Sequence, residues 1–204
     1  MALELGILVA DAAMLGRALD LARNFDEAQL FLMDEGVRAA GEPRLRAAID
    51  DGLDASLCAM DAEARAVAPT TGGPRFGSQW DHATMVRDAA RVVAMTGGRI
   101  DDSDAAVSQQ TSALPTGARR VAVRLTRDVR DAKTAQALRS AVGYASADLA
   151  VTVVVEPAAR ELLAHDDHPA AILKAVATLR ALGHRFVEVA TANHRVSCDV
   201  EVSW

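Results

Sequence analysis

A single cysteine at a strand-to-helix junction is the residue in this chain with the clearest chemical potential. Cys58 ends the apolar run 55–58 and stands directly before the helix-forming stretch 59–67. A thiolate there can act as a nucleophile, and the positive end of a helix favours that anion by about 0.3 to 1 kcal/mol. This is less than one pKa unit, so an attacking thiol needs further cationic help. Cys58 is therefore a candidate carrier of a chemical group, with a packed core thiol as the alternative.

Basic residues from neighbouring segments could supply that help. Arg38 and Arg75 fall in segments expected to be loops near Cys58, and His82 opens the helix after the glycine-rich segment 72–77. We predict that Arg38, Arg75 and His82 hold a substrate near the sulfur. A solvent-facing or helix-packing role is the alternative for His82.

Other motifs give weaker signals. The glycine-rich segment 72–77 lacks the Lys-Ser/Thr pair of a phosphate-binding loop, and we expect a flexible lid there. The sequence from His165 to His168 offers metal-ligand types but no further ligand, so we expect neither a metal nor a cofactor. Cys198 lies on the apolar side of an alternating C-terminal stretch, and we interpret it as a buried, inert thiol.

The pattern of apolar runs predicts two similar halves of α/β type. A polar, breaker-rich stretch separates them, which gives domains 1–97 and 119–204 with a linker over 98–118. Segments 31–38 and 153–160 resemble each other, as do 52–58 and 183–189, which indicates a duplication. We expect strands at 5–9, 29–33, 55–58, 121–125, 151–155, 186–190 and 196–204, and helices at 12–24, 45–50, 81–95, 132–147 and 170–182.

Alternation of strands with helices predicts mainly parallel sheets covered on both faces. Ligand chemistry in such sheets lies beyond the carboxyl ends of the strands, which is where Cys58 falls. The order of elements therefore places the candidate sulfur at the edge of the sheet where a binding site is expected.

Composition limits the class of protein and its partners. The chain has 204 residues, 50% of them hydrophobic and 3% aromatic, which suits one large or two small globular domains with aliphatic cores. A net charge of -6 argues against nucleic-acid binding. The sequence shows neither a signal peptide nor an apolar run of membrane-spanning length, so we expect a cytoplasmic protein without a membrane partner or a structural disulfide.

The first half resembles the DsrE-like family, small α/β proteins of sulfur relay and intracellular sulfur oxidation. The resemblance rests on segment 31–37, Phe-Leu-Met-Asp-Glu-Gly-Val, and on segment 58–67, which begins at Cys58. In carrier members of the family a cysteine, small residues and then Arg-Gly-Val follow the third strand. Arg65 and Val67 match this motif, whereas Ala66 replaces its glycine. The resemblance adds Arg65 to the expected substrate-binding residues, although it lies about two helical turns beyond the sulfur.

The resemblance implies a fold and a function for the whole chain. We expect two tandem three-layer DsrE-like domains that form a pseudo-dimer, or a homo-oligomer of such chains. The second copy lacks the cysteine, with Val189 or Ala190 at its position. Cys58 would accept sulfane sulfur as a persulfide and pass it to a thiol of a partner protein, as a possible sulfurtransferase. The alternative is a non-catalytic module for assembly or for binding a small molecule.

Overall fold

The computed structural model describes residues 2–95, 117–164, 167–191 and 194–204. Contacts divide the chain into two compact units, Met1–Ala113 (unit 1) and Leu114–Trp204 (unit 2). The expected linker 98–118 lies outside the described residues as far as residue 116. Among the described helices, none is long and apolar enough to cross a membrane.

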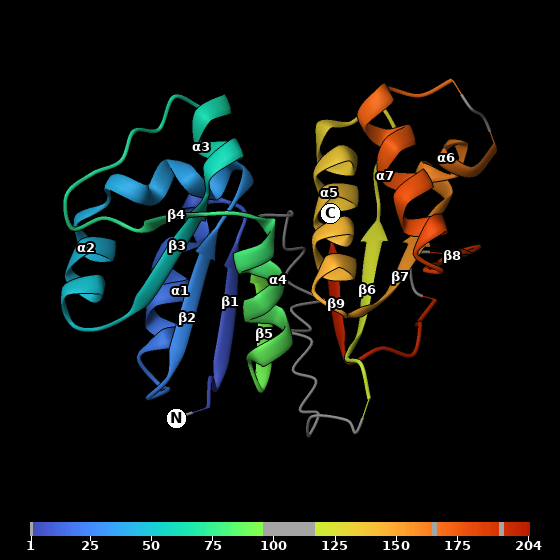
Figure 1. Ribbon diagram of the computed structural model, residues 1–204. Helices are drawn as coiled ribbons and strands as arrows, with labels where there is room; N and C mark the ends of the chain where they lie inside the picture. Colours follow the sequence, from blue (N-terminus) through green and yellow to red (C-terminus); the bar gives the residue numbers. More distant parts are fainter. Residues whose placement is uncertain (1, 96–116, 165–166, 192–193) are drawn as a thin grey trace. The chain divides into compact units, whose positions relative to one another are not determined.

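Unit 1 contains one five-stranded sheet in the order β4-β3-β2-β1-β5, and every neighbouring pair is parallel (Figure 1). The predicted α/β class and parallel sheet are therefore confirmed for this unit. The strands are β1 (Leu5–Val9), β2 (Ala28–Leu32), β3 (Asp54–Cys58), β4 (Arg75–Gly77) and β5 (Arg91–Met95).

Helical segments cover both faces of this sheet, because its strands are apolar on both sides. One face packs on α1 (Leu15–Ala22), η2 (Asp34–Gly41) and α2 (Pro43–Asp50) through an aliphatic core. The other face receives α4 (Gln79–Asp88). A Cβ atom added to Gly6 of β1 would lie 3.0 Å from Cγ of Met85, so α4 approaches this inner strand closely. The short helix α3 (Ala59–Ala64) follows β3.

The expected helix over 81–95 is only partly correct. Its start is confirmed, because Ser78 and Asp81 form the predicted capping box, but α4 ends at Asp88 and 91–95 form β5. Val93 of β5 pairs with Ile7 of the inner strand β1. Pairing of this Val-rich segment with β1 outweighs its helical spacing, since valine also suits a strand.

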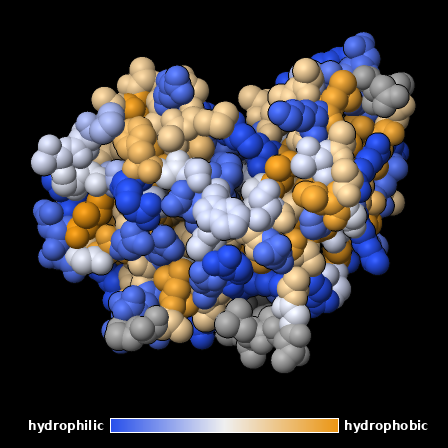
Figure 2. Space-filling model, in the orientation of Figure 1, coloured by the Kyte–Doolittle hydropathy of each residue, from blue (hydrophilic) through white to orange (hydrophobic). Residues whose placement is uncertain are grey.

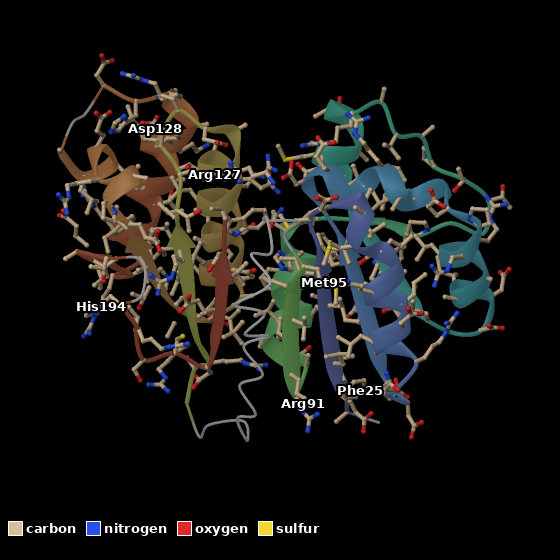
Figure 3. The ribbon with its side chains drawn as sticks, turned by 180° about the vertical axis from the view of Figure 1, so that it is seen from behind. Phe25, Arg91, Met95, Arg127, Asp128 and His194 are labelled. Carbon is tan, nitrogen blue, oxygen red and sulfur yellow. The ribbon has the colours of Figure 1, made fainter. Side chains whose placement is uncertain are left out.

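A cation–π contact lies at the amino end of β5. The guanidinium group of Arg91 lies 5.8 Å from the ring centre of Phe25. Figure 3 shows these two residues at one end of the sheet of unit 1, with Met95 further along β5.

The glycine-rich segment is also more regular than predicted. Residues 75–77 form β4 at the edge of the sheet, with Gly77 paired to Cys58. The interpretation of the whole segment 72–77 as a loop is therefore wrong for its second half.

Unit 2 contains a four-stranded parallel sheet in the order β8-β7-β6-β9. Helix α5 packs on β6 and β7 and contacts α7. Its elements are β6 (Arg120–Leu125), α5 (Ala132–Ser146), β7 (Ala150–Val155), η3 (Pro157–Ala159), α6 (Glu161–Ala164), α7 (Ala170–Ala181), β8 (Arg185–Glu188) and β9 (Val200–Ser203).

A loop segment contributes to the face of this sheet opposite α5. Ala122 and Val154 pack there against Val189, Val196 and Cys198. The predicted C-terminal strand over 196–204 is therefore too long, because its first residues belong to this loop. Cys198 is half-buried, and burial raises the pKa of its thiol.

A buried arginine ties the same loop to the sheet. Arg124 of β6 donates to Glu201 at 2.7 Å, to Glu156 at 3.3 Å and to the carbonyl oxygen of His194 at 2.8 Å. These contacts join β6, β9, the end of β7 and the loop that carries His194, which is labelled in Figure 3. One guanidinium group thus holds four segments of unit 2 together.

The two units share a common arrangement of strands. The strand order β3-β2-β1-β5 of unit 1 corresponds to the order β8-β7-β6-β9 of unit 2. Unit 1 has β4 as an additional edge strand. In both units the helix before the third strand ends at a left-handed glycine, Gly52 with φ +105° and Gly183 with φ +81°. These features support the predicted duplication. Residues 59–90, which include α3, β4 and α4, correspond to the shorter segment 189–199 in unit 2.

The surface facing the viewer in Figure 2 mixes hydrophilic and hydrophobic residues over each unit. The described large hydrophobic side chains that are exposed are few. They are Met60, Phe76, Trp80, Leu173 and Leu182.

Gly36 provides a test of how closely η2 packs on β1. A Cβ atom added there would lie 2.1 Å from the carbonyl oxygen of Val9, a backbone atom that cannot move away cheaply. We expect Gly36→Ala to lower the free energy of unfolding of unit 1 by about 3 kcal/mol. The measurement is urea unfolding followed by Trp80 fluorescence in a Trp204→Phe background.

Gly41 of the same element is the matched control. A Cβ atom there would meet nothing within 4 Å. Gly41→Ala should leave the urea midpoint nearly unchanged, and equal losses in the two variants would contradict the proposed steric cause.

Candidate functional site

Cys58 is the last residue of β3 and the N-cap residue of α3. It therefore lies at the carboxyl edge of the sheet, as the sequence predicts. Its side chain is buried, with 1% of the residue exposed, whereas the next two residues, Ala59 and Met60, are exposed. The sulfur thus lies just below the surface and is closed to a bulky donor in this conformation.

Gln79 connects the sulfur to a buried histidine. Its Nε2 donates to the Sγ atom of Cys58 at 3.7 Å, and its Oε1 lies 3.4 Å from Nδ1 of His82. His82, a residue of α4, is fully buried and stacks on Phe31, with ring centres 5.0 Å apart. We call Phe31, Cys58, Gln79 and His82 the Cys58 site.

Burial keeps the imidazole of His82 uncharged, because it lowers the pKa of His82 to about 3. The amide oxygen of Gln79 can only accept a hydrogen bond, so the neutral ring donates from Nδ1. The expected approach of His82 to Cys58 is thus indirect, through Gln79, and His82 brings no positive charge to the sulfur.

The start of α4 is held rigidly beside the site. Ser78 donates to Asp81 from its backbone at 2.7 Å, and Arg75 donates to Asp81 at 3.3 Å. Burial raises the pKa of Asp81, but the hydrogen bonds from Ser78 and Arg75 outweigh this effect and lower it. Arg75 also lies 3.7 Å from Asp54. Arg75 is therefore engaged with the carboxylates of Asp81 and Asp54.

Arg38 and Arg65 are likewise engaged in ion pairs. Arg38 donates to Glu35 at 2.6 Å, and Arg65 donates to Glu35 at 2.8 Å and also pairs with Asp34. The hydrogen bonds from Arg38 and then Arg65 lower the pKa of Glu35. Asp61 accepts a hydrogen bond from the backbone N–H of Asp34 at 2.9 Å.

Of the four predicted binding residues, His82 is linked to the sulfur through Gln79. Sequence reasoning did not include the acidic residues Asp34 and Glu35 in the site, although they follow the carboxyl end of β2 after Met33. It also missed Gln79, whose only sequence signal is its place next to the capping residue Ser78.

Unit 2 has a different residue at the position of Cys58. The sheet pairs Leu32 with Leu57 in unit 1 and Val154 with Val187 in unit 2. Since Val154 corresponds to Leu32 in the repeat, the residue equivalent to Cys58 is Glu188. The predicted equivalence with Val189 is therefore off by one position. Glu188 pairs with Arg160.

The described residues contain no group of three His, Cys, Asp or Glu side chains that could hold a metal ion. His165 and Asp166, from the sequence considered above as a possible metal ligand set, lie outside the described residues. Comparisons with protein-family models, with curated proteins and with solved structures each find no match to this chain.

Ala66 adopts a backbone conformation that favours glycine. Its φ angle is +53°, and it follows α3 in a helix-ending turn in which the Val67 N–H donates to the Ala62 carbonyl at 2.8 Å. A left-handed conformation costs a residue with a Cβ atom about 1 kcal/mol or more. This is the position at which the family motif Arg-Gly-Val has its glycine.

We therefore expect Ala66→Gly to raise the free energy of unfolding of unit 1 by about 1 kcal/mol. The same urea assay measures the change. Ala64→Gly, two residues earlier inside α3, is the matched control and should lower stability by about 0.5 to 1 kcal/mol. Destabilisation by both substitutions would contradict the proposed role of the left-handed turn.

The buried His82 predicts a pH dependence of stability. The unfolded chain binds a proton at His82 below about pH 6.5, whereas the folded chain does not until about pH 3. The free energy of unfolding should therefore fall as the pH drops through this range, with His82 contributing about 1.4 kcal/mol per pH unit. Urea unfolding of unit 1 at pH 7, 6 and 5 measures this slope.

His82→Phe and His82→Gln both remove the ionisable ring. The two variants should differ in their free energy of unfolding at any one pH. In both, this free energy should change less steeply with pH than in the unsubstituted chain. An unchanged slope in both would show that His82 is accessible to protons in the folded state.

Proposed function

We propose that this chain is a DsrE-like sulfur-transfer protein in which Cys58 carries sulfane sulfur as a persulfide. The observation that carries the proposal is the position of Cys58 at the carboxyl edge of a parallel sheet, one side chain below the surface. The left-handed Ala66 adds support, because it gives a physical reason for the glycine of the family motif.

The transfer step conserves electrons. The thiol of Cys58 loses its proton to solvent, and the thiolate attacks the outer sulfur of a donor persulfide. The sulfur–sulfur bond of the donor breaks, a new bond forms to the Sγ atom of Cys58, and the donor leaves as a thiolate that takes up a proton. Attack by an acceptor thiol on the outer sulfur of Cys58 reverses these changes and completes the relay.

The partners of such a relay would be a donor protein that presents a persulfide and an acceptor protein that presents a thiol. Arg38, Arg65 and Arg75 would act in this scheme by holding the segments around the site, because each pairs with a carboxylate. Unit 2 has Glu188 at the equivalent position and would serve in the pseudo-dimer as a structural copy. The proposed setting is the cytoplasm.

The burial of Cys58 favours a second candidate function. A thiol with 1% of its residue exposed resembles a packed core residue. On this reading the chain is a non-catalytic module for assembly or for binding a small molecule. It requires a Cys58 that stays closed in solution and that can be replaced without loss of function.

Sulfur loading distinguishes the two functions. We expect the reduced chain, treated with a cysteine desulfurase and cysteine, to gain the mass of one sulfur atom on the peptide that contains Cys58. Cys58→Ser should gain none, and Cys198 of the same molecule is the internal control for non-specific loading. Equal loading of both cysteines, or loading of neither, would overturn the carrier proposal and favour the non-catalytic module.

A further inference from the structure

We propose that the side chain of Gln79 is a movable cover that closes and positions the sulfur of Cys58. The inference rests on the proposed sulfur-transfer function for its biological meaning. The access that it describes can be measured without any sulfur transfer.

The first support is the contact between a partly exposed side chain, Gln79, and the buried sulfur. Gln79 is only partly buried, and its Nε2 lies 3.7 Å from the buried Sγ atom of Cys58. Gly77, the residue paired with Cys58 on the edge strand β4, has no side chain that could close the site. The amide of Gln79 therefore provides cover at this edge.

The second support is the fixed anchor on the inner side. The amide oxygen of Gln79 lies 3.4 Å from Nδ1 of His82, whose ring is fully buried and stacked on Phe31. The histidine cannot follow an outward movement of the amide, so opening breaks this contact and the contact to the sulfur together.

The backbone beneath the cover is fixed. Gln79 is the first residue of α4, and the capping box of Ser78 and Asp81 holds this helix end. Arg75 bonds to the same Asp81. Rotation about the side-chain bonds of Gln79 can therefore open the site while α4 stays in place.

The contact with His82 opposes opening. An amide that turns outward can bond to water, but the buried ring of His82 cannot, so the loss of its contact with Gln79 makes the open form the minor one. The closed form is thus compatible with brief access by a donor, and a glutamine amide can still donate a hydrogen bond to the sulfur when it returns.

The rate of alkylation of each cysteine by iodoacetamide tests the cover. Peptide mass spectrometry of the full-length, reduced chain follows Cys58 and Cys198 in the same sample. We expect Gln79→Ala to speed alkylation of Cys58 about ten-fold, the effect of losing a hydrogen bond that opposes local opening. The rate at Cys198 should not change, which excludes general loosening of the chain.

Gln29→Ala is the matched control, because Gln29 is a partly buried glutamine at the opposite end of β2. It should leave both rates unchanged. Equal rates at Cys58 in the unsubstituted chain, Gln29→Ala and Gln79→Ala would overturn the proposal.

Gln79→Glu tests the positioning of the sulfur separately. A carboxylate has a similar length, but its negative charge disfavours a neighbouring thiolate. The pH profile of Cys58 alkylation should move to higher pH in this variant, and an unchanged profile would show that residue 79 does not contact the reacting sulfur.

The outcomes separate the cover from the carrier function. Faster alkylation in Gln79→Ala without sulfur loading of the unsubstituted chain would support the cover and refute the carrier. Sulfur loading at Cys58 with no effect of Gln79→Ala on alkylation would support the carrier and refute the cover.

Discussion

The close packing of α4 against the sheet of unit 1 is the contact on which the surroundings of Cys58 depend. Gly6 makes room for Met85 at the centre of the sheet, and Phe31 receives the ring of His82. These contacts fix the start of α4 beside the end of β3. If α4 were displaced, the sulfur would lose its amide partner, and a buried imidazole would lose its aromatic neighbour. One helix position therefore sets both the burial of the thiol and its hydrogen bonding.

Much of the architecture follows from sequence patterns that have a single physical reading. Alternating strands and helices predict parallel sheets, and Ser78 with Asp81 predicts the start of α4. The end of that helix was not predictable from spacing, because Val92 and Val93 fit either an apolar helix face or a strand. Pairing with the inner strand β1 decided between the two, and such a contact between distant segments leaves no local signal.

The candidate site was predictable in position but not in detail. The order of elements places Cys58 at the carboxyl edge, and the structure agrees. The sulfur accepts a hydrogen bond from Gln79, a residue that no motif distinguishes. The expectation that arginines bind a substrate near the sulfur stays a prediction, and the structure pairs Arg65 and Arg75 with carboxylates at the same edge. A guanidinium group that is paired with a carboxylate has less positive charge available to stabilise a neighbouring thiolate.

Each unit carries a buried acidic residue after its second strand: Asp34 follows β2 after Met33, and Glu156 directly follows β7. Asp34 pairs with Arg65 from the end of α3, whereas Glu156 pairs with Arg124 from β6. A carboxylate buried without a cation is costly. The two units therefore compensate equivalent buried charges with cations from different parts of the fold, one placed after the third strand and the other within the sheet itself.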